Sequence, residues 1–477
     1  MQPVGAQGIV GAVSEMAARG NCGVQLTLEQ IPVREEPLSP RELLLSETWG
    51  RILVCFKKND LETIKNSLVD SRLKFAVIGE VVDGDKLVCE YQQSTVAEIP
   101  VAYVGLGGKA PIYDRMYHEP SEKPLPVNVD DLPEPDHYPN VVRTMIKGLN
   151  LSSRQWLIDK FDRTLHRESL SHQFPSDATF INIPDSKKSL AATVDCNPNY
   201  MKGDPNVGAQ IAVAEASRNI VCAGGDPIGI VDCLNFGNPY DPVSYWQFVM
   251  AVQGLSRAAE TFKVPVLGGN VSFYNQRSEE GKVVPIIPTP VIGMIGLVEN
   301  KKHHTTLSFK QKGDMIFLLG RSRNDVNGSE YLSIIHNTDP LMPPVYHEDE
   351  ELAIQKAVKG LIGNELVRSV HDVSNGGLFF CLLECAIPLE FGFDITSDAE
   401  IRKDAFLFGE SQSRVVVSVA PGKQDSFVDY LIEMKVPFSI LGHVTKGEIR
   451  VDDESFGFVG DLILRFESAL KVWAEKA

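Results

Sequence analysis

Short apolar runs and longer amphipathic stretches alternate along the middle of this 477-residue chain. The apolar runs are bounded by glycine, proline or polar residues, which predicts buried strands at 191–195, 229–234, 264–268 and 290–298. Helical spacing predicts helices at about 207–223 and 243–262, and the second begins with Asp241-Pro242, an N-cap followed by proline in the first turn. Strands and helices that alternate in this way predict an α+β fold.

The chain contains two related copies of one pattern, and this repeat is its most informative feature. The first copy has "QPVGAQGI" from residue 2, "LLSETWGR" from 44 and "VIGEV" from 77. The second copy has "HDVSNGGL" from 371, "LFGESQSR" from 407 and "ILGHV" from 440. Gly8 then aligns with Gly377 and Glu47 with Glu410, so three motifs recur in one order at nearly one spacing.

The two copies differ in what precedes them. Residues 310–370 lead into the second copy with a predicted strand at 315–319 and two helical stretches, whereas the first copy starts directly at its motif. We therefore expect a first unit that is incomplete at its N-terminus, with the strand and helices supplied by another segment or another chain. An apolar edge that stays open would favour aggregation.

These patterns divide the chain into four parts. Residues 1–116 hold the first copy, and residues 117–150 begin with a proline-rich acidic stretch that predicts an extended linker. Residues 151–308 form a distinct α+β unit, and residues 309–477 hold the second copy with the elements that lead into it.

The composition narrows the class of protein. A formal charge of −17 argues against general binding to nucleic acid or to anionic membranes. The eight cysteines form no Cys-x-x-Cys pair and predict free thiols in a reducing cytoplasm. No apolar run reaches membrane-spanning length, and no signal-peptide pattern is present. We expect a cytoplasmic protein with neither a membrane nor a nucleic acid as its partner.

Polar residues of the unit 151–308 indicate a metal–nucleotide site. Glu215 and Asn219 are four residues apart on one helical face, beside small residues, and their oxygens suit a hard cation. The structural alternative is a buried glutamate paired with Arg218. Asp195 and Asp232 lie at or near predicted strand ends, where metal–phosphate sites of α/β units are common.

A loop acid and a glycine pair add to this site. Asp177 lies in the loop "FPSDATF", and Gly268-Gly269-Asn270 interrupts an apolar run, where glycine would let a phosphate approach the backbone. A simple turn at the glycines and a loop cap at the acid are the alternatives. The chain has no GxxxxGK[ST] motif, which excludes a P-loop, and no GxGxxG after a strand, which argues against a dinucleotide fold.

The second copy carries His371 and Asp372 before a Gly-Gly turn, which favours a backbone nest for an anion beside a metal carboxylate. A structural histidine is the alternative. The first copy has Gln2-Pro3 at these positions, so the carboxylate is lost there, and it has Thr48-Trp49 where the second has Ser411-Gln412. The two copies are therefore not chemically equivalent.

These motifs give the chain a family resemblance. "DCLNFGNP", "GGNVSFYN", "HDVSNGGL" and "LFGESQSR" resemble the large subunit of phosphoribosylformylglycinamidine synthase. The resemblance covers nearly the whole chain, and the chain resembles the C-terminal part of that subunit. The resemblance implies units like those of aminoimidazole ribotide synthetase, with mixed sheets and flanking helices: an N-type nucleotide and Mg²⁺ domain at 151–308 and C-type domains at 1–116 and 309–477. It also implies ATP-dependent amidation of formylglycinamide ribonucleotide, with ammonia from glutamine delivered by a glutaminase subunit.

The family's functional residues carry over position by position. The resemblance implies ATP contacts at Asp232 and Gly269, a Mg²⁺ ligand at Asn270, substrate contacts at Ser272 and at Glu47, Thr48 and Trp49, and an auxiliary nucleotide and metal site at Asp177, Glu215, Asn219 and Asp372. A family Mg²⁺-binding aspartate aligns with Pro3 and is lost. The family's catalytic histidines have no counterpart in this sequence, so the catalytic residues are expected in the missing N-terminal unit.

Two main hypotheses follow. The chain is a purine-biosynthesis synthetase, or part of one, that is inactive alone and works with an N-terminal half or an oligomer partner. Alternatively it is a non-catalytic, nucleotide-stabilised half or a degenerate remnant, which Pro3 and Trp49 favour. A third possibility, another enzyme of the superfamily, is opposed by the "LNFGNP" stretch.

Overall fold

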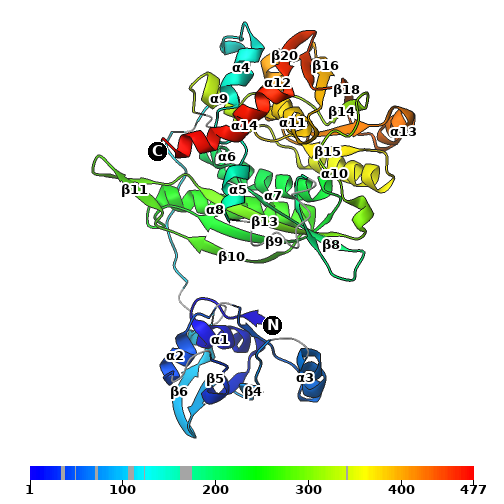
Figure 1. Ribbon diagram of the computed structural model, residues 1–477. Helices are drawn as coiled ribbons and strands as arrows, with labels where there is room; N and C mark the ends of the chain where they lie inside the picture. Colours follow the sequence, from blue (N-terminus) through cyan, green and yellow to red (C-terminus); the bar gives the residue numbers. More distant parts are fainter. Residues whose placement is uncertain are drawn as a thin grey trace. The chain divides into compact units, whose positions relative to one another are not determined.

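The computed structural model describes residues 1–33, 38–48, 50–69, 73–105, 112–122, 124–161, 175–339 and 342–476. These residues form two compact units, Met1–Asp114 and Arg115–Ala477 (Figure 1). Each unit combines mixed sheets with helices, so the predicted α+β class is confirmed. Among the described helices, none is both long and apolar enough to cross a membrane.

The first unit has a four-stranded sheet in the order β4–β2–β5–β6 and a separate pair, β1–β3. The strands are β1 (Gln2–Pro3), β2 (Gly23–Thr27), β3 (Ile52–Leu53), β4 (Gly79–Val82), β5 (Lys86–Tyr91) and β6 (Ser94–Pro100). The helices are α1 (Gly8–Gly20), α2 (Pro40–Leu45) and α3 (Leu61–Val69). The apolar side of α1 packs with β2 and β5 into one core, which includes Ile9, Val13, Leu26 and Leu87.

The second unit begins with a five-stranded sheet in the order β10–β9–β13–β8–β7. The strands are β7 (Thr179–Asn182), β8 (Ser189–Asp195), β9 (Asp226–Asn235), β10 (Val266–Ser272) and β13 (Thr289–Val298). Helices α7 (Pro205–Cys222) and α8 (Pro242–Phe262) cover one face of it (Figure 1). Alternate residues of β13 are buried, because one face of this strand meets the helices and the other does not.

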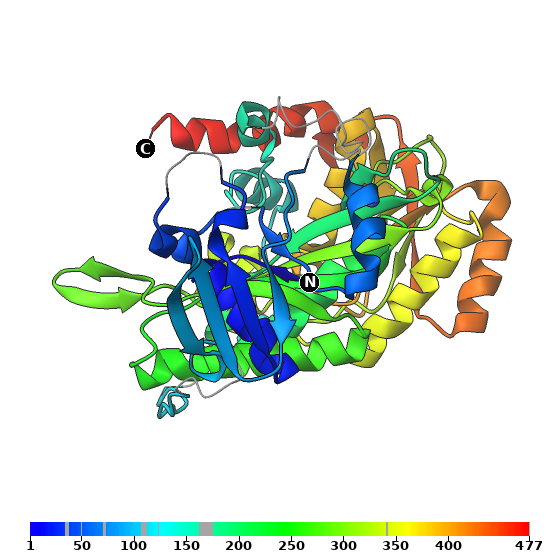
Figure 2. The ribbon, with the colours of Figure 1, turned by 90° about the horizontal axis from the view of Figure 1, so that it is seen from below.

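A short hairpin extends this unit. Its strands are β11 (Gln276–Glu279) and β12 (Lys282–Pro285), and it projects from the unit in both views (Figures 1 and 2). The short helix α6 (Pro198–Gly203) leads into α7, which Asp204 caps by accepting hydrogen bonds from the N–H groups of Asn206 and Val207.

The rest of the second unit is a seven-stranded sheet in the order β15–β17–β14–β18–β16–β19–β20. The strands are β14 (Met315–Leu319), β15 (Ser369–Asp372), β16 (Gly392–Ile395), β17 (Val415–Val419), β18 (Phe438–Thr445), β19 (Glu448–Val451) and β20 (Glu454–Phe458). Its helices are α9 (Glu330–Ile335), α10 (Glu348–Gly363), α11 (Gly377–Ala386), α12 (Lys403–Phe408), α13 (Gln424–Met434) and α14 (Val459–Ala474). The predicted strand at 315–319 coincides with β14.

The segment 117–150 differs from the expected extended linker. Its first part is mostly exposed, but α4 (Tyr138–Met145) is a helix whose residues Tyr138, Val142 and Met145 are buried in the core beside α11. The apolar residues of α4 recur with helical spacing, and burying them outweighs the extended preference of the preceding prolines. A further helix, α5 (Gln155–Phe161), follows. The second half of 117–150 therefore belongs to the packed second unit.

Candidate functional site

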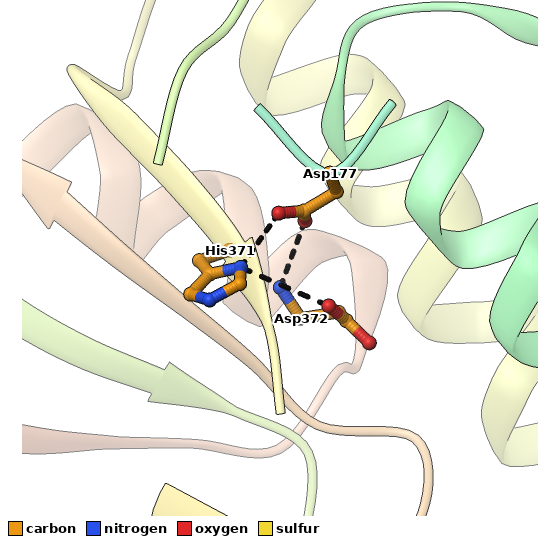
Figure 3. A group of neighbouring side chains, drawn as sticks. All are labelled: Asp177, His371 and Asp372. Atoms are coloured by element: carbon orange, nitrogen blue, oxygen red, sulfur yellow. Dashed lines mark hydrogen bonds and ion pairs between the residues drawn. The ribbon is translucent and has the colours of Figure 1, made fainter. Parts of the chain in front are cut away.

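Four elements of the second unit bring acidic side chains together. Asp177 lies in the loop before β7, Asp195 ends β8, Glu215 lies on α7, and Asp372 ends β15. Asp177 and Asp372 are far apart in sequence, yet Figure 3 shows them beside each other with His371. Their atoms are close enough to His371 for the three residues to hold one metal ion.

His371 links two carboxylates. Its Nδ1 lies 2.6 Å from Asp177 Oδ1, and its Nε2 lies 3.0 Å from Glu384 Oε2 on α11. Burial by itself would lower the pKa of His371, but Asp177, Cys381 and Glu384 together outweigh it and hold that pKa well above its ordinary value. Both ring nitrogens then donate, as only the imidazolium can. His371 therefore fixes Asp177, and Asp177 Oδ2 also accepts the backbone N–H of Asp372 at 3.0 Å.

Arg218 is the buried cation of the cluster. Its side chain is 1% exposed, and its closest carboxylate is Glu351 of α10, at 2.7 Å. The guanidinium also lies 3.6 Å from Asp372 Oδ2 and 3.8 Å from Glu215 Oε2. Glu351 is held in turn by Ser413 and Gln355, which donate hydrogen bonds of 2.6 and 2.9 Å. Arg218 thus has one tight partner and two looser ones.

The electrostatics show that this cluster lacks positive charge. Burial, followed by repulsion from Asp372, raises the pKa of Asp195 to about 8. Burial, followed by repulsion from Asp177, raises the pKa of Asp372 to about 6. Burial, followed by repulsion from Asp195, raises the pKa of Glu215 well above its ordinary value. Arg218 opposes all three rises and does not cancel them.

The donor set fits a hard cation with phosphate oxygens. Asp372 Oδ2 is buried and accepts no hydrogen bond from the residues that the structure describes, so it retains ligand capacity. Carboxylate and amide oxygens are the ligands that Mg²⁺ accepts. The Asn219 amide belongs to the same cluster, because its Nδ2 donates to Asp195 Oδ2 at 3.2 Å. A pocket of about 360 Å³ opens beside Asp177 and is also lined by Ser176, Thr179, Ala192 and Val194.

The predicted ATP contacts lie on β9 and β10, in the same sheet. Gly269 pairs with Asp232, and a Cβ at Gly269 would lie 2.1 Å from Asp232 Oδ1. Any side chain at this position would displace the Asp232 carboxylate, and its Cβ would also lie 2.8 Å from the Asp232 backbone oxygen. Asp232 of β9 and Asp195 of β8 both pair with Ile292 of β13, the strand between them. Side chains of paired residues point to the same face of a sheet, so both acids point to the helix-covered face. Burial raises the pKa of Asp232.

The structure does not place Asn270 with Asp232. Asn270 pairs with Cys233 and Ser272 with Asn235, so their side chains point to the face of the sheet opposite Asp232 and Gly269. Asn270 is exposed, and Ser272 lies 3.4 Å from Asn275 Oδ1. The glycine pair also forms no turn, because β10 runs through both glycines to Ser272.

The predicted substrate loop lies in the first unit, between α2 and β3. Glu47 is exposed and Thr48 half-buried, while Trp49 lies outside the described residues. The counterpart of Glu47 in the second copy, Glu410, is fully buried. Glu410 accepts hydrogen bonds from Tyr200 Oη and from the backbone N–H groups of Glu330 and Gly376.

Four predicted residues therefore lie in one cluster: Asp177, Glu215, Asn219 and Asp372. Sequence reasoning gave no role to Glu351. Glu351 is one acid of the run "HEDEELAI", which resembles a solvated helix start. Its burial comes from Arg218, more than a hundred positions away, so no local signal could identify it.

Models of protein families match most of the chain. The AIR synthase related protein, N-terminal domain, matches residues 175–298, and the AIR synthase related protein, C-terminal domain, matches residues 1–92 and 311–454. The second model thus covers both copies of the repeat that the sequence contains.

Curated relatives carry the name phosphoribosylformylglycinamidine synthase subunit PurL. The protein from Caldanaerobacter subterraneus subsp. tengcongensis is 36% identical over 95% of this chain and 61% of its own length. The protein from Salinibacter ruber is 38% identical over 94% of this chain and 61% of its own length. The chain thus spans about three fifths of the length of these relatives.

A solved structure shares the fold. Thermotoga maritima PurL complexed with ATP is 22% identical, with a TM-score of 0.57 over 93% of this chain and 63% of that one. The same protein complexed with FGAR gives a TM-score of 0.58 at 22% identity, over 93% and 61%. Since the two domain models together match well over half of its residues, the chain belongs to the AIR synthase related proteins, and among them it resembles the large subunit of phosphoribosylformylglycinamidine synthase.

Proposed function

We propose that the chain acts in purine biosynthesis, in the ATP-dependent amidation of formylglycinamide ribonucleotide to formylglycinamidine ribonucleotide. The observation that carries the proposal is the cluster of Asp177, Asp195, Glu215 and Asp372, in which Glu215 and Asp372 are buried and the electrostatics call for cations. The PurL name of the relatives and the ATP and FGAR complexes of the Thermotoga protein support the nucleotide and the substrate.

The auxiliary nucleotide site would be formed by Asp177, Glu215, Asn219 and Asp372. Mg²⁺ held there would neutralise charge on nucleotide phosphates. The chain's own residues prepare the site: His371 orients Asp177, and Glu351 holds Arg218 so that its guanidinium faces Asp372 and Glu215. This arrangement fixes the carboxylates in place before any ligand arrives.

A second set of residues would contact ATP and substrate. Asp232 and Gly269 would contact ATP from the helix-covered face of the sheet. From the other face, Asn270 would be a metal ligand and Ser272 would contact the substrate. Glu47, Thr48 and Trp49 would contribute substrate contacts from the first unit. The catalytic residues themselves would come from a further polypeptide segment, and ammonia from a glutaminase partner in the cytoplasm.

We also propose that this chain alone does not complete the reaction. Pro3 stands where the second copy has Asp372, and proline offers no side-chain oxygen to a metal. Glu47 is exposed whereas Glu410 is buried and fully hydrogen-bonded. These differences also favour the second candidate, a non-catalytic half that nucleotide stabilises.

An ammonia-dependent assay separates the synthetase from the non-catalytic half. The purified chain is incubated with ATP, Mg²⁺, ammonia and formylglycinamide ribonucleotide, with and without the N-terminal half of a PurL relative. The synthetase proposal expects product only when the half is added, and expects Asp232→Asn to lower the rate at least tenfold. No product in any mixture would favour the non-catalytic half, and steady product from the chain alone would contradict the proposed dependence.

A further inference from the structure

The first residues of the second unit lie against the start of helix α8. The Arg115 guanidinium lies over two tyrosine rings, 4.9 Å from the ring centroid of Tyr240 and 5.8 Å from that of Tyr245. Tyr117 meets the Tyr245 ring edge-on, with ring centroids 6.0 Å apart. Residues 115–118 therefore form a strap that is held to α8 by a cation and aromatic rings.

A series of aromatic contacts leads from the strap to the loops beside the proposed substrate contact. Tyr245 stacks on Phe248, with ring centroids 5.8 Å apart. Phe248 in turn meets Phe236 and Phe273 edge-on, with centroids 5.3 and 5.1 Å away. Phe236 follows the end of β9, and Phe273 follows Ser272, the last residue of β10. The side of Tyr245 that contacts the strap is thus connected to both loops.

These two loops are also joined by hydrogen bonds. The backbone N–H of Phe236 donates to Ser272 O at 3.0 Å, and the backbone N–H of Asn275 donates to Phe236 O at 3.1 Å. The side-chain amide of Asn275 donates to Ser272 O as well, at 2.9 Å. Residues 236–241 and 272–275 therefore form one loop junction, and the Ser272 hydroxyl belongs to it.

The loop junction contains a residue in an unfavourable backbone conformation. Tyr274 has a φ of 61°, in the left-handed region that residues other than glycine rarely adopt. Tyr274 is 54% exposed, so burial of its ring does not hold this conformation. Such strain persists only where surrounding contacts fix the backbone, and the Tyr274 N–H donates to Gly237 O at 2.9 Å across the junction. The conformation of the loop junction therefore depends on what holds residues 236–241.

We propose that Arg115 is a positioning residue that braces the loop junction and so holds the Ser272 hydroxyl in place for the substrate. A guanidinium is attracted to the negative face of an aromatic ring, and Arg115 lies over two such rings. Through Tyr240 it holds the loop 236–241 directly, and through the aromatic series it supports both loops. This inference rests on the proposed substrate contact at Ser272, and it adds the residue that keeps this contact in position.

Hydrogen exchange of the full chain tests the brace. Arg115→Met keeps an unbranched side chain and removes the cation, and we expect exchange in segments 236–241 and 272–275 to become about tenfold faster. Arg115→Lys keeps a cation over the rings and should give an intermediate rate. Met116→Ala is the matched control, because Met116 lies in the same strap and is 88% exposed. It should leave both segments as slow as in the original chain.

Three results would overturn the proposal. The first is unchanged exchange of the loop junction in Arg115→Met, and the second is an equal acceleration in Met116→Ala. The third is a similar acceleration in segments 205–222 and 289–298, because Arg115 would then support the whole unit and not the junction. Tyr240→Leu is a second variant, which removes one ring from the same contact and leaves Arg115 in place. It should accelerate exchange in the loop junction alone, and an unchanged rate there would also contradict the brace.

A kinetic measurement connects the brace to the proposed reaction. In the ammonia-dependent assay with the added N-terminal half, Arg115→Met should raise the KM for formylglycinamide ribonucleotide by about threefold or more and leave the KM for ATP unchanged. The reason is that Ser272 lies on the face of the sheet opposite Asp232 and Gly269. An equal rise in both KM values, or no rise in an active mixture, would overturn the positioning role and leave the synthetase proposal intact. If no mixture makes product, the synthetase proposal fails, whereas hydrogen exchange, which needs no substrate, still decides whether Arg115 braces the junction.

Discussion

At the scale of single residues, Arg218 decides which acids of the cluster are structural and which are free for a ligand. A buried cation needs a tight partner, and Glu351 supplies it at 2.7 Å together with its own hydrogen bonds from Ser413 and Gln355. Glu215 lies farther from the guanidinium, at 3.8 Å. The two glutamates therefore differ in role although both face the same arginine.

This difference predicts opposite results for two alanine variants. Glu351→Ala removes the tight partner of Arg218 and should cost about 3–5 kcal/mol of unfolding free energy. Glu215→Ala should cost less than about 1 kcal/mol, because Arg218 keeps Glu351 and an acid with an unfavourably raised pKa is removed. Glu215→Ala should also weaken Mg²⁺–nucleotide binding at least tenfold. Melts with and without ligand measure both effects, and a collapse of ligand-free Glu215→Ala with nucleotide affinity intact would contradict the metal role.

Glu410 predicts a dependence of stability on pH. Burial raises its pKa to about 7, from an ordinary value of 4.5, so the folded state binds this proton more tightly than the unfolded chain. Its contribution to stability is therefore full below about pH 4.5 and is lost as the pH rises to about 7, over a range of at most about 3 kcal/mol. Glu410→Gln should flatten this part of the stability curve.

Glutamine closely matches Glu410 in shape and in its hydrogen bonds. Glu410 Oε1 accepts both backbone hydrogen bonds and Oε2 accepts the Tyr200 hydroxyl, so a glutamine can keep the first two and donate to the third. Urea unfolding at several pH values between 4.5 and 7 measures the effect. A variant whose stability falls with pH as steeply as that of the original chain would show that another group is responsible.

Some residues of the site could be predicted from the local sequence pattern, and others only from the family resemblance. Glu215 and Asn219 share a helical face, and Asp195 ends a strand, so local pattern sufficed to identify them as candidates. Asp177 and Asp372 were each candidates from their local setting, but they meet only through the packing of two domains, and only the family resemblance assigned them to one site. Glu351 lacks both kinds of signal, because its helix start resembles a solvated one.

At the scale of elements, the helices α7 and α8 were predicted within two residues of their observed ends, and β10 was not. Asp204-Pro205 and Asp241-Pro242 mark the starts of α7 and α8 by capping chemistry that is local in sequence. In β10 the two glycines suggested a turn, yet the strand continues because the parallel partner β9 supplies its hydrogen bonds and Asp232 needs the space above Gly269. That requirement comes from a residue more than thirty positions away and could not be found locally.

The two adjacent glycines therefore predict different costs of substitution. Gly269→Ala places a methyl group 2.1 Å from Asp232 Oδ1, so the carboxylate must move, at a cost of about 1–3 kcal/mol and with weaker ATP binding. Gly268→Ala is the control, because nothing lies within 4 Å of its Cβ position, and it should change stability by less than about 0.5 kcal/mol. Thermal melts and ATP titrations of both variants measure the two effects. Equal losses of stability and ATP affinity in Gly269→Ala and Gly268→Ala would contradict the proposed contact.

At the scale of the whole molecule, the repeat was predictable because its motifs carry strand ends and glycine turns whose spacing the fold preserves. The structure repeats even the pairing register of β1–β3 in β15–β17. The division of the first copy into two sheets was expected only as an open edge. The helix α4 was missed, because the prolines that precede it dominate the composition of 117–150.

The two units should respond differently to nucleotide. Met1–Asp114 and Arg115–Ala477 have separate cores, and the whole carboxylate cluster lies in the second. Calorimetry of the full chain should therefore show two transitions, of which Mg²⁺ with a non-hydrolysable ATP analogue raises only that of the second unit. At one hundred times its Kd, the ligand should add about 2.7 kcal/mol to that unit. Hydrogen exchange assigns each transition to its unit, and Asp372→Ala, which removes a proposed ligand, should abolish the shift. A shift in the first unit as well, or none in either, would contradict the assignment of the nucleotide site to the cluster.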